Sequence, residues 1–324
     1  MSRQYLSQHT IDNAHDADIF ALAATPTSII SASGSSSIKI YSTLSDEFPI
    51  AQVLKDAHPL GVHHLTISRN YQTLVSVGFE GSAKIWRYTS GAWSEAGEIQ
   101  AAKKAGELWA VCLDTEGRFL VGTTSDGRVN VWEVITGDGN SATAKKFAEW
   151  ETRGTFGLAV DISPDNKLTA TSHPTGNIYV FSTNTTRLLH SLPTQASPVR
   201  VLKFSPGSSL LAAGGDSRSI HLYDPASGEE IAMLRGHDAW ITSLDWSYTG
   251  EYLLSGSLDG KVKVWDVNTR TCVATHTADE AKGLWSVKWL PKGETSGERS
   301  KAERFVIAGN GRAIGVYREA SGAA

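Results

Sequence analysis

The segment 234–266 carries side chains of the kinds that hydrolases use. His237 lies in "LRGHDAWITSLDW", and Ser255 and Asp259 lie in "SGSLDGKVKVWDV". In a serine hydrolase, a histidine takes the proton of the serine hydroxyl while an acid holds the histidine in place. The same residue types also occur as buried hydrogen-bonding groups of repeated structural units. Whether the set recurs at a repeat spacing decides between these two interpretations.

The tail of that segment, "KVKVWDV", has weaker copies along the whole chain. The seven copies are spaced by 45, 46, 49, 42, 42 and 52 residues. These intervals are close to the length of one blade of a WD-repeat propeller. The aromatic residues of the copies are Tyr41, Trp86, Trp132, Phe181, Tyr223, Trp265 and Tyr317.

Each copy belongs to a unit with the pattern of four short strands. An apolar segment such as "VHHLTISRN" precedes a strand of small residues such as "LLSGS", and an irregular strand such as "AQVLKD" follows the tail. Turn residues separate the strands, and we find no helical periodicity. We therefore predict one all-β domain over residues 1–324, a seven-bladed WD-repeat β-propeller.

The two ends of the chain predict how the ring closes. The last unit stops after its third strand, at "AIGVYREASGAA", and a strand-like piece, "RQYLSQHTI", precedes the first unit. We expect this N-terminal strand to pair into the last blade as its missing outer strand. Such pairing leaves no open edge between the first and last blades.

The polar set does recur at the repeat spacing. A histidine, a serine and an acid lie 28, 10 and 6 residues before the tryptophan in both the sixth and the second unit. A catalytic triad has no reason to repeat, whereas buried polar groups must be hydrogen-bonded wherever they occur. We therefore predict a structural role for His237, Ser255, Asp259 and Trp265, and for His58, Ser76, Glu80 and Trp86.

Most other units keep only fragments of this set. The third unit retains Asp126 and Trp132 but has Gly122 in place of the serine. The fourth, fifth and seventh units have phenylalanine or tyrosine instead of tryptophan. We expect these blades to rely on apolar packing of their aromatic rings.

Composition and spacing argue against several classes of function. A net charge of −4 and a pI near 6.2, without a basic block, disfavour direct nucleic-acid binding. Cys112 and Cys272 stand far apart, and His63 and His64 are strand neighbours that point to opposite faces, so we expect neither a metal site nor a cofactor.

The N-terminus lacks a signal-peptide pattern and no apolar run could span a membrane, which predicts a soluble intracellular protein. The charged insertion 292–303 is expected to be a surface loop.

Large aromatic residues and a few acids fall where the inner strands begin or where the third strands start to turn. In a propeller these positions surround the central channel on one face. We predict that this face binds a protein partner, because exposed aromatic clusters mark interaction sites; alternatively, several of the rings lean inward and seal the channel. The predicted partner-binding residues are Asp18, Phe20, Phe79, Glu107, Trp109, Phe156, Arg200, Trp240, Leu258 and Trp285.

Four segments in order, "AHDADIF", "AHPLGVHHLTIS", "GKVKVWDVNTRTCVATHTAD" and "LWSVKW", resemble the family of small WD-repeat subunits of the superkiller complex. The resemblance covers essentially the whole chain. It implies a non-catalytic adaptor in a cytoplasmic hetero-oligomer with a helicase subunit and a tetratricopeptide-repeat scaffold subunit. That assembly feeds mRNA to the exosome for 3′-to-5′ decay, and its RNA-handling activity belongs to the partners.

The same resemblance implies two alternative roles. Fungal relatives act in meiotic recombination by binding a DNA double-strand-break protein, and animal relatives join a nuclear transcription-elongation complex. Family ligands share a Gln-Arg-x-x-aromatic/apolar motif that docks on the propeller face. A propeller enzyme, or a small-ligand sensor that uses the central channel, is the rival from another class.

Overall fold

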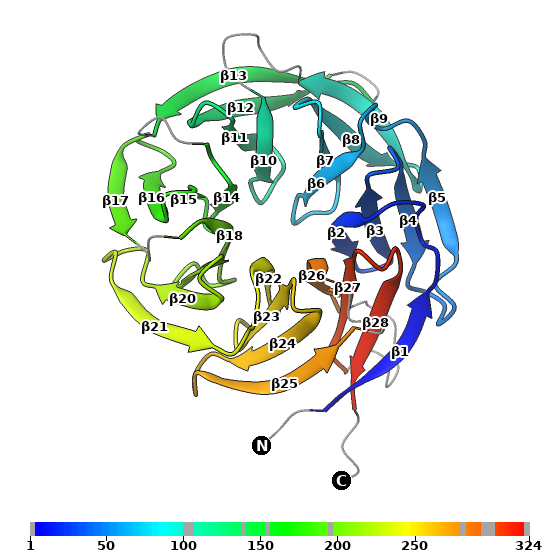
Figure 1. The fold of residues 1–324 in the computed structure, drawn as a ribbon. Coiled ribbons are helices and arrows are strands. Elements are labelled where there is room, and N and C mark those ends of the chain that lie inside the picture. The colour runs from blue at the N-terminus through cyan, green and yellow to red at the C-terminus, as the bar shows by residue number, and fades with distance from the viewer. Residues whose placement is uncertain are drawn as a thin grey trace.

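The computed structural model describes residues 4–99, 107–137, 140–152, 156–193, 197–278, 283–292 and 302–320. Seven four-stranded antiparallel sheets stand around a central axis like blades (Figure 1). In each blade the first strand lies next to the axis and the fourth lies on the rim. The prediction of an all-β, seven-bladed propeller is confirmed.

The strands of the first four blades follow one another along the chain. Blade 1 consists of β2 (Ile19–Thr25), β3 (Ser28–Ser33), β4 (Ile38–Ser42) and β5 (Ile50–Leu54). Blade 2 consists of β6 (Val62–Ile67), β7 (Thr73–Gly78), β8 (Ala83–Thr89) and β9 (Ala92–Ile99). Blade 3 consists of β10 (Leu108–Leu113), β11 (Phe119–Thr124), β12 (Arg128–Thr136) and β13 (Ala142–Glu151). Blade 4 consists of β14 (Ala159–Ile162), β15 (Leu168–Ser172), β16 (Asn177–Ser182) and β17 (Leu188–Pro193).

The last three blades complete the ring. Blade 5 consists of β18 (Val199–Phe204), β19 (Leu211–Gly215), β20 (Ser219–Tyr223) and β21 (Glu230–Arg235). Blade 6 consists of β22 (Ile241–Trp246), β23 (Tyr252–Ser257), β24 (Lys261–Asp266) and β25 (Thr271–Thr277). Blade 7 consists of β26 (Leu284–Trp289), β27 (Arg304–Gly309), β28 (Ile314–Glu319) and β1 (Tyr5–Ile11).

The N-terminal strand closes the ring as predicted. β1 pairs antiparallel with β28, from Tyr5 opposite Glu319 to Ile11 opposite Ile314. The Tyr5 ring is buried, and its centroid lies 5.2 Å from that of Phe305 and 6.0 Å from that of Trp289. The first strand of the chain therefore contributes both hydrogen bonds and core packing to the last blade.

The hydrophobic core lies between blades rather than within them. One cluster joins Ile30 and Ile40 of blade 1 to Leu74 and Trp86 of blade 2, and similar clusters occupy the other junctions. Blades without the tryptophan pack other rings there: Phe181 stacks on Trp150 of blade 3 at 4.9 Å. A blade cannot bury these faces alone, so each sheet depends on both of its neighbours.

Side chains of the inner strands also hydrogen-bond to the backbone of an adjacent blade. Five of them accept an N–H from a strand of another sheet, which fixes the spacing of blades around the axis. These bonds are Leu22 N to Ser286 Oγ (3.1 Å), Leu113 N to Thr66 Oγ1 (3.2 Å), Phe204 N to Asp161 Oδ2 (2.8 Å), Val287 N to Ser243 Oγ (3.0 Å) and Trp289 N to Asp245 Oδ2 (2.8 Å).

Ring closure predicts unequal effects of two neighbouring substitutions in β1. Tyr5→Ala should lower the free energy of unfolding by about 3 kcal/mol, because it leaves a cavity among buried rings. Leu6→Ala should cost less than about 1 kcal/mol, because that side chain is 47% exposed. Deleting residues 1–10 should cost more than either change. Chemical denaturation measures all three, and equal losses for Tyr5→Ala and Leu6→Ala would contradict the closure role.

Candidate functional site

The polar set of blade 6 is a continuous hydrogen-bonded chain inside the protein. Trp265 Nε1 donates to Ser255 Oγ at 2.8 Å, Ser255 Oγ lies 2.7 Å from His237 Nε2, and His237 Nδ1 lies 2.9 Å from Asp259 Oδ2. The Asp259 carboxylate can only accept, so Nδ1–H of the histidine donates to it; in the neutral ring Nε2 then accepts the proton of Ser255, whose oxygen accepts from Trp265. Ser255 has no exposed surface. This order of bonds holds the blade together and gives the serine no route to a substrate.

Blade 2 repeats the arrangement with a longer acid. His58 Nε2 lies 2.9 Å from Ser76 Oγ, which also accepts from Trp86 Nε1 at 2.9 Å. His58 Nδ1 is hydrogen-bonded to the Glu80 carboxylate. Ser76 and His58 are fully buried, so this set also lies out of reach of a substrate.

Blade 1 contains a third version that the sequence analysis did not identify. His15 Nε2 lies 2.8 Å from Ser31 Oγ and its Nδ1 lies 2.8 Å from Ser33 Oγ. Tyr41 replaces the tryptophan and donates to the backbone carbonyl of Ala14 at 2.9 Å. The signal available in the sequence was Ser31, which stands at the usual ten-residue offset from Tyr41.

Five of the predicted partner-binding residues lie around the channel mouth in one connected aromatic arc. Neighbouring rings have centroids 4.5–5.6 Å apart, and His63 bridges Phe79 and Trp109. The arc, which we call the mouth arc, runs in the order Trp285, Phe20, Phe79, His63, Trp109 and Phe156.

The rings of the mouth arc are not equally exposed. Phe79 is 39% exposed, whereas Phe20, Trp109 and Trp285 are half-buried; all four rings line the central cavity. The mouth arc thus lines the top of the central cavity and also presents the Phe79 ring at the surface. Burial lowers the pKa of His63 to about 3, so this ring is neutral near pH 7 and stacks as an aromatic group.

Trp240 and Arg200 lie outside the mouth arc, over blades 5 and 6. The Arg200 guanidinium stands 4.1 Å from the centroid of the Trp240 ring and forms an ion pair with Asp216. Trp240 is 43% exposed. One face of its ring is thus already covered by a cation that has its own carboxylate partner.

The remaining predicted residues are two acids and a leucine on the same face. Asp18 precedes β2 and is half-buried, Glu107 precedes β10 and is exposed, and Leu258 donates its backbone N–H to the Trp240 carbonyl at 2.9 Å. Within the described residues, neither the Asp18 nor the Glu107 carboxylate forms an ion pair. Both acids are therefore available to a cationic partner group.

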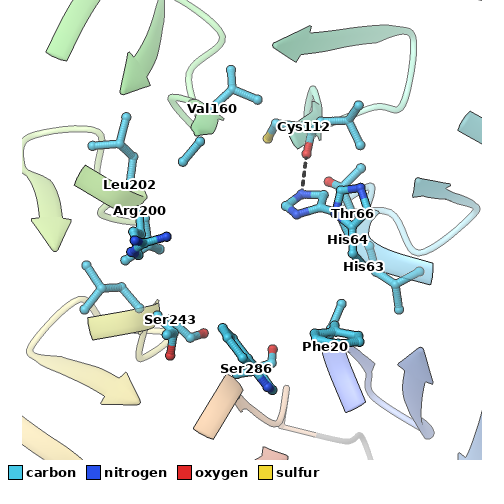
Figure 2. Close-up of a pocket in the computed structure, with 18 of the residues that line it drawn as sticks. Phe20, His63, His64, Thr66, Cys112, Val160, Arg200, Leu202, Ser243 and Ser286 are labelled. Carbon is cyan, nitrogen blue, oxygen red and sulfur yellow. Dashed lines mark hydrogen bonds between the residues drawn. The ribbon is translucent and has the colours of Figure 1, made fainter. Parts of the chain in front are cut away.

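Beneath the mouth arc the channel widens into a cavity of about 450 Å³ (Figure 2). Its lower wall is polar and includes His64, Cys112, Asp161, Lys203 and Lys288. His64 Nε2 bonds to the Val111 carbonyl at 2.9 Å, while His63 stacks in the arc above, so the two histidines diverge. No cluster of three His, Cys, Asp or Glu side chains suited to a metal ion occurs within the ranges that the structure describes.

Comparisons with known proteins agree with the arrangement of blades. The sequence profile of the WD domain, G-beta repeat matches residues 97–133, 186–224 and 228–266. Meiotic recombination protein rec14 of Schizosaccharomyces pombe is 36% identical over 321 residues, which cover 99% of each chain. The chain belongs to the rec14 family of WD-repeat proteins. Antiviral protein SKI8 of Saccharomyces cerevisiae, 26% identical over 99% of this chain and 100% of its own, is a second full-length relative.

Similarity outside the rec14 family is partial. Echinoderm microtubule-associated protein-like 3 of Homo sapiens is 30% identical over half of this chain and 18% of its own length. That match covers a run of repeats and carries no information on shared partners. In the part of the chain that is described, no helix has the length and hydropathy needed to cross a bilayer.

The buried set of blade 6 predicts a specific loss of stability in acid. Burial by itself would raise the pKa of Asp259, but hydrogen bonds from His237 and from the backbone of Asp238 and Lys261 hold it well below its ordinary value. A depressed pKa stabilises the fold above the unfolded-state value of about 4 and ceases to do so as the pH falls below it. Asp259→Asn should therefore cost about 1–3 kcal/mol at pH 7 and progressively less below about pH 4.

Denaturation curves between neutral and acid pH measure this difference. Asp238→Asn is the matched control, because that neighbouring carboxylate is 74% exposed and pairs only with a surface lysine, Lys261. It should change stability little at any pH. A cost of Asp259→Asn that does not shrink in acid would contradict the role of the buried carboxylate.

Proposed function

We propose that this chain is a non-catalytic adaptor subunit of a superkiller-type complex. In that complex it assembles with a tetratricopeptide-repeat scaffold subunit and a helicase subunit, and it supports exosome-mediated 3′-to-5′ mRNA decay in the cytoplasm. The observation that carries the proposal is the mouth arc, with its exposed Phe79 ring, on a chain whose full length matches rec14 and SKI8. An open aromatic surface beside unpaired acids is suited to binding a short partner segment.

The polar sets support an adaptor rather than an enzyme. Their serines are fully buried and already accept a hydrogen bond from tryptophan. Activation of a nucleophile requires that the serine oxygen reach a substrate atom. The features that first suggested hydrolysis are therefore used to hold blades 2 and 6 together.

The face suggests how a partner segment is bound. An apolar or aromatic residue of the segment packs on Phe79 and the edge of Trp109, which exclude water from it. An arginine of the segment pairs with Asp18 or Glu107, whose carboxylates are free on the same face. A guanidinium can bond a carboxylate through two N–H groups while lying against a ring. A Gln-Arg-x-x-Tyr segment combines both features.

A meiotic role is the second candidate. It is favoured by the higher identity to meiotic recombination protein rec14, 36% against 26% for antiviral protein SKI8. In this role the same face binds a double-strand-break protein and the chain acts in the nucleus. The two roles share one docking surface and differ in the partner that occupies it.

Titration of a Gln-Arg-x-x-Tyr peptide tests the docking face. Phe79→Ala should weaken binding by about 2–4 kcal/mol, as expected for a central aromatic anchor. Asp18→Lys should weaken it by replacing attraction with repulsion, with little change in stability. Trp240→Ala should have a smaller effect, because Trp240 stands apart from the arc and already stacks on Arg200. Calorimetry measures each affinity.

Tyr248→Ala is the matched control for that titration. Tyr248 is 83% exposed and follows β22, at the opposite end of that strand from Trp240. The Tyr248→Ala variant should bind the peptide with the same affinity as the wild type. Equal affinities in Phe79→Ala, Asp18→Lys and the control, with folding intact, would place the binding site elsewhere.

Purification from the native source distinguishes the two candidate roles. Wild-type protein should co-purify with a helicase and a tetratricopeptide-repeat protein, and Phe79→Ala should lose them while Tyr248→Ala retains them. Recovery of a recombination protein alone, from meiotic cells, would support the second role. Intact assembly with Phe79→Ala would contradict both.

A further inference from the structure

The central cavity has a charge pattern that partner binding on the mouth arc does not explain. Its lower wall holds Lys203 of blade 5 and Lys288 of blade 7, each paired with an acid of the preceding blade. The pairs are Lys203 with Asp161, at 2.6 Å, and Lys288 with Asp245, at 3.0 Å. Both lysines line the same cavity as Ser243 and Ser286, which Figure 2 labels.

Both oxygens of each carboxylate accept hydrogen bonds from the protein. Asp161 accepts from Lys203, from the thiol of Cys112 at 3.3 Å and from the backbone N–H of Phe204 at 2.8 Å. Asp245 accepts from Lys288 and from the backbone N–H of Trp289 at 2.8 Å. Both acids are thereby fixed in the wall, where they serve the contacts between adjacent blades.

The two lysines retain hydrogen-bonding capacity. An ammonium donates in three directions, and within the described residues each lysine has one acceptor. The Lys203 and Lys288 side chains are 32% and 24% exposed, against 5% and 15% for Asp161 and Asp245. The cations therefore face the cavity while their counter-ions lie behind them.

Apart from Arg200, whose guanidinium pairs with Asp216, the rest of the cavity is neutral and largely apolar. Burial lowers the pKa of His64 to about 4, so this ring carries no charge near pH 7. Higher walls include Leu22, Val160 and Leu202, below the rings of the mouth arc. A cavity of about 450 Å³ with apolar walls and a few convergent polar groups has the form of a small-molecule site.

We propose that the central cavity binds a small organic oxyanion, whose carboxylate or phosphate group is held between Lys203 and Lys288 and whose apolar body lies against the walls below the mouth arc. The lysine donors supply charge-assisted hydrogen bonds to the anion. The site lies in the channel below the docking face, whose rings line the same cavity, and it does not depend on the proposed function.

Calorimetry with the purified full chain tests the site, with phenyl phosphate, benzoate, phenol and benzylamine as probes. Phenyl phosphate and benzoate should bind with one molecule per chain, and phenol, which has the ring without the anion, should bind at least about tenfold more weakly. Benzylamine should not bind. Raising the salt concentration should weaken the binding of phenyl phosphate and leave the binding of phenol unchanged.

Two variants locate the binding within the cavity. Lys288→Met removes one ammonium, while Asp245 keeps its bond to Trp289 N. This variant should bind phenyl phosphate at least about tenfold more weakly. Leu158→Trp fills the cavity from the wall without touching either ion pair, so it remains informative if the charge variant fails to fold. Lys263→Met is the matched control, because its ammonium bonds to Thr275 Oγ1 on the outer strands of blade 6.

The expected result is loss of anion binding in Lys288→Met and Leu158→Trp and retention in Lys263→Met. Phenol binding as tightly as phenyl phosphate would overturn the proposal. So would phenyl phosphate affinity that is unchanged in both cavity variants. Neither outcome bears on the docking face, which is tested separately by the peptide titration with Phe79→Ala.

Discussion

The structure depends on one constraint: no blade can bury its own apolar faces. Each sheet is only four strands wide, and the residues that form its core, such as Leu74 and Trp86 of blade 2, pack against the neighbouring sheet. A row of such sheets has two exposed ends, so it becomes stable only when the last sheet meets the first. Pairing of β1 with β28 satisfies this requirement with hydrogen bonds, and burial of Tyr5 adds packing.

Closure explains why the polar sets need not occur in every blade. A histidine, serine and acid fix the inner turn of blades 2 and 6, and a related set with two serines does so in blade 1. Blade 3 has Gly122 instead, and a Cβ atom there would lie 3.1 Å from the Trp132 ring. The ring occupies the space that a serine would need. Blades held on both sides by apolar contacts tolerate this exchange of hydrogen bonds for packing.

Much of the fold and part of the candidate site could be predicted from the sequence. Strand order, blade number and closure follow from periodicity, and the sets around Trp86 and Trp265 follow from fixed offsets along one chain segment. The set around His15 was missed because tyrosine replaces the tryptophan and shifts the geometry. Contacts between blades could not be predicted in this way. The stacking of Arg200 on Trp240 and the position of His63 between Phe79 and Trp109 depend on distances between blades, which the residue spacing within one repeat does not encode.

The channel shows why such contacts matter for function. Seven blades leave an axis too wide for inner-strand side chains to pack across it, so these side chains must find partners around the ring. Asp161 and Asp245 do so by bonding to the backbone of the next blade, and they hold Lys203 and Lys288 beside them. The lysines are more exposed than the acids that hold them, so the ammonium groups reach the channel from the contacts that join the blades. The aromatic mouth follows from a different requirement, since the turns above the channel have no neighbour to pack against and their rings stack on one another. The same ring thus carries aromatic side chains at the mouth of the channel and charged side chains within it.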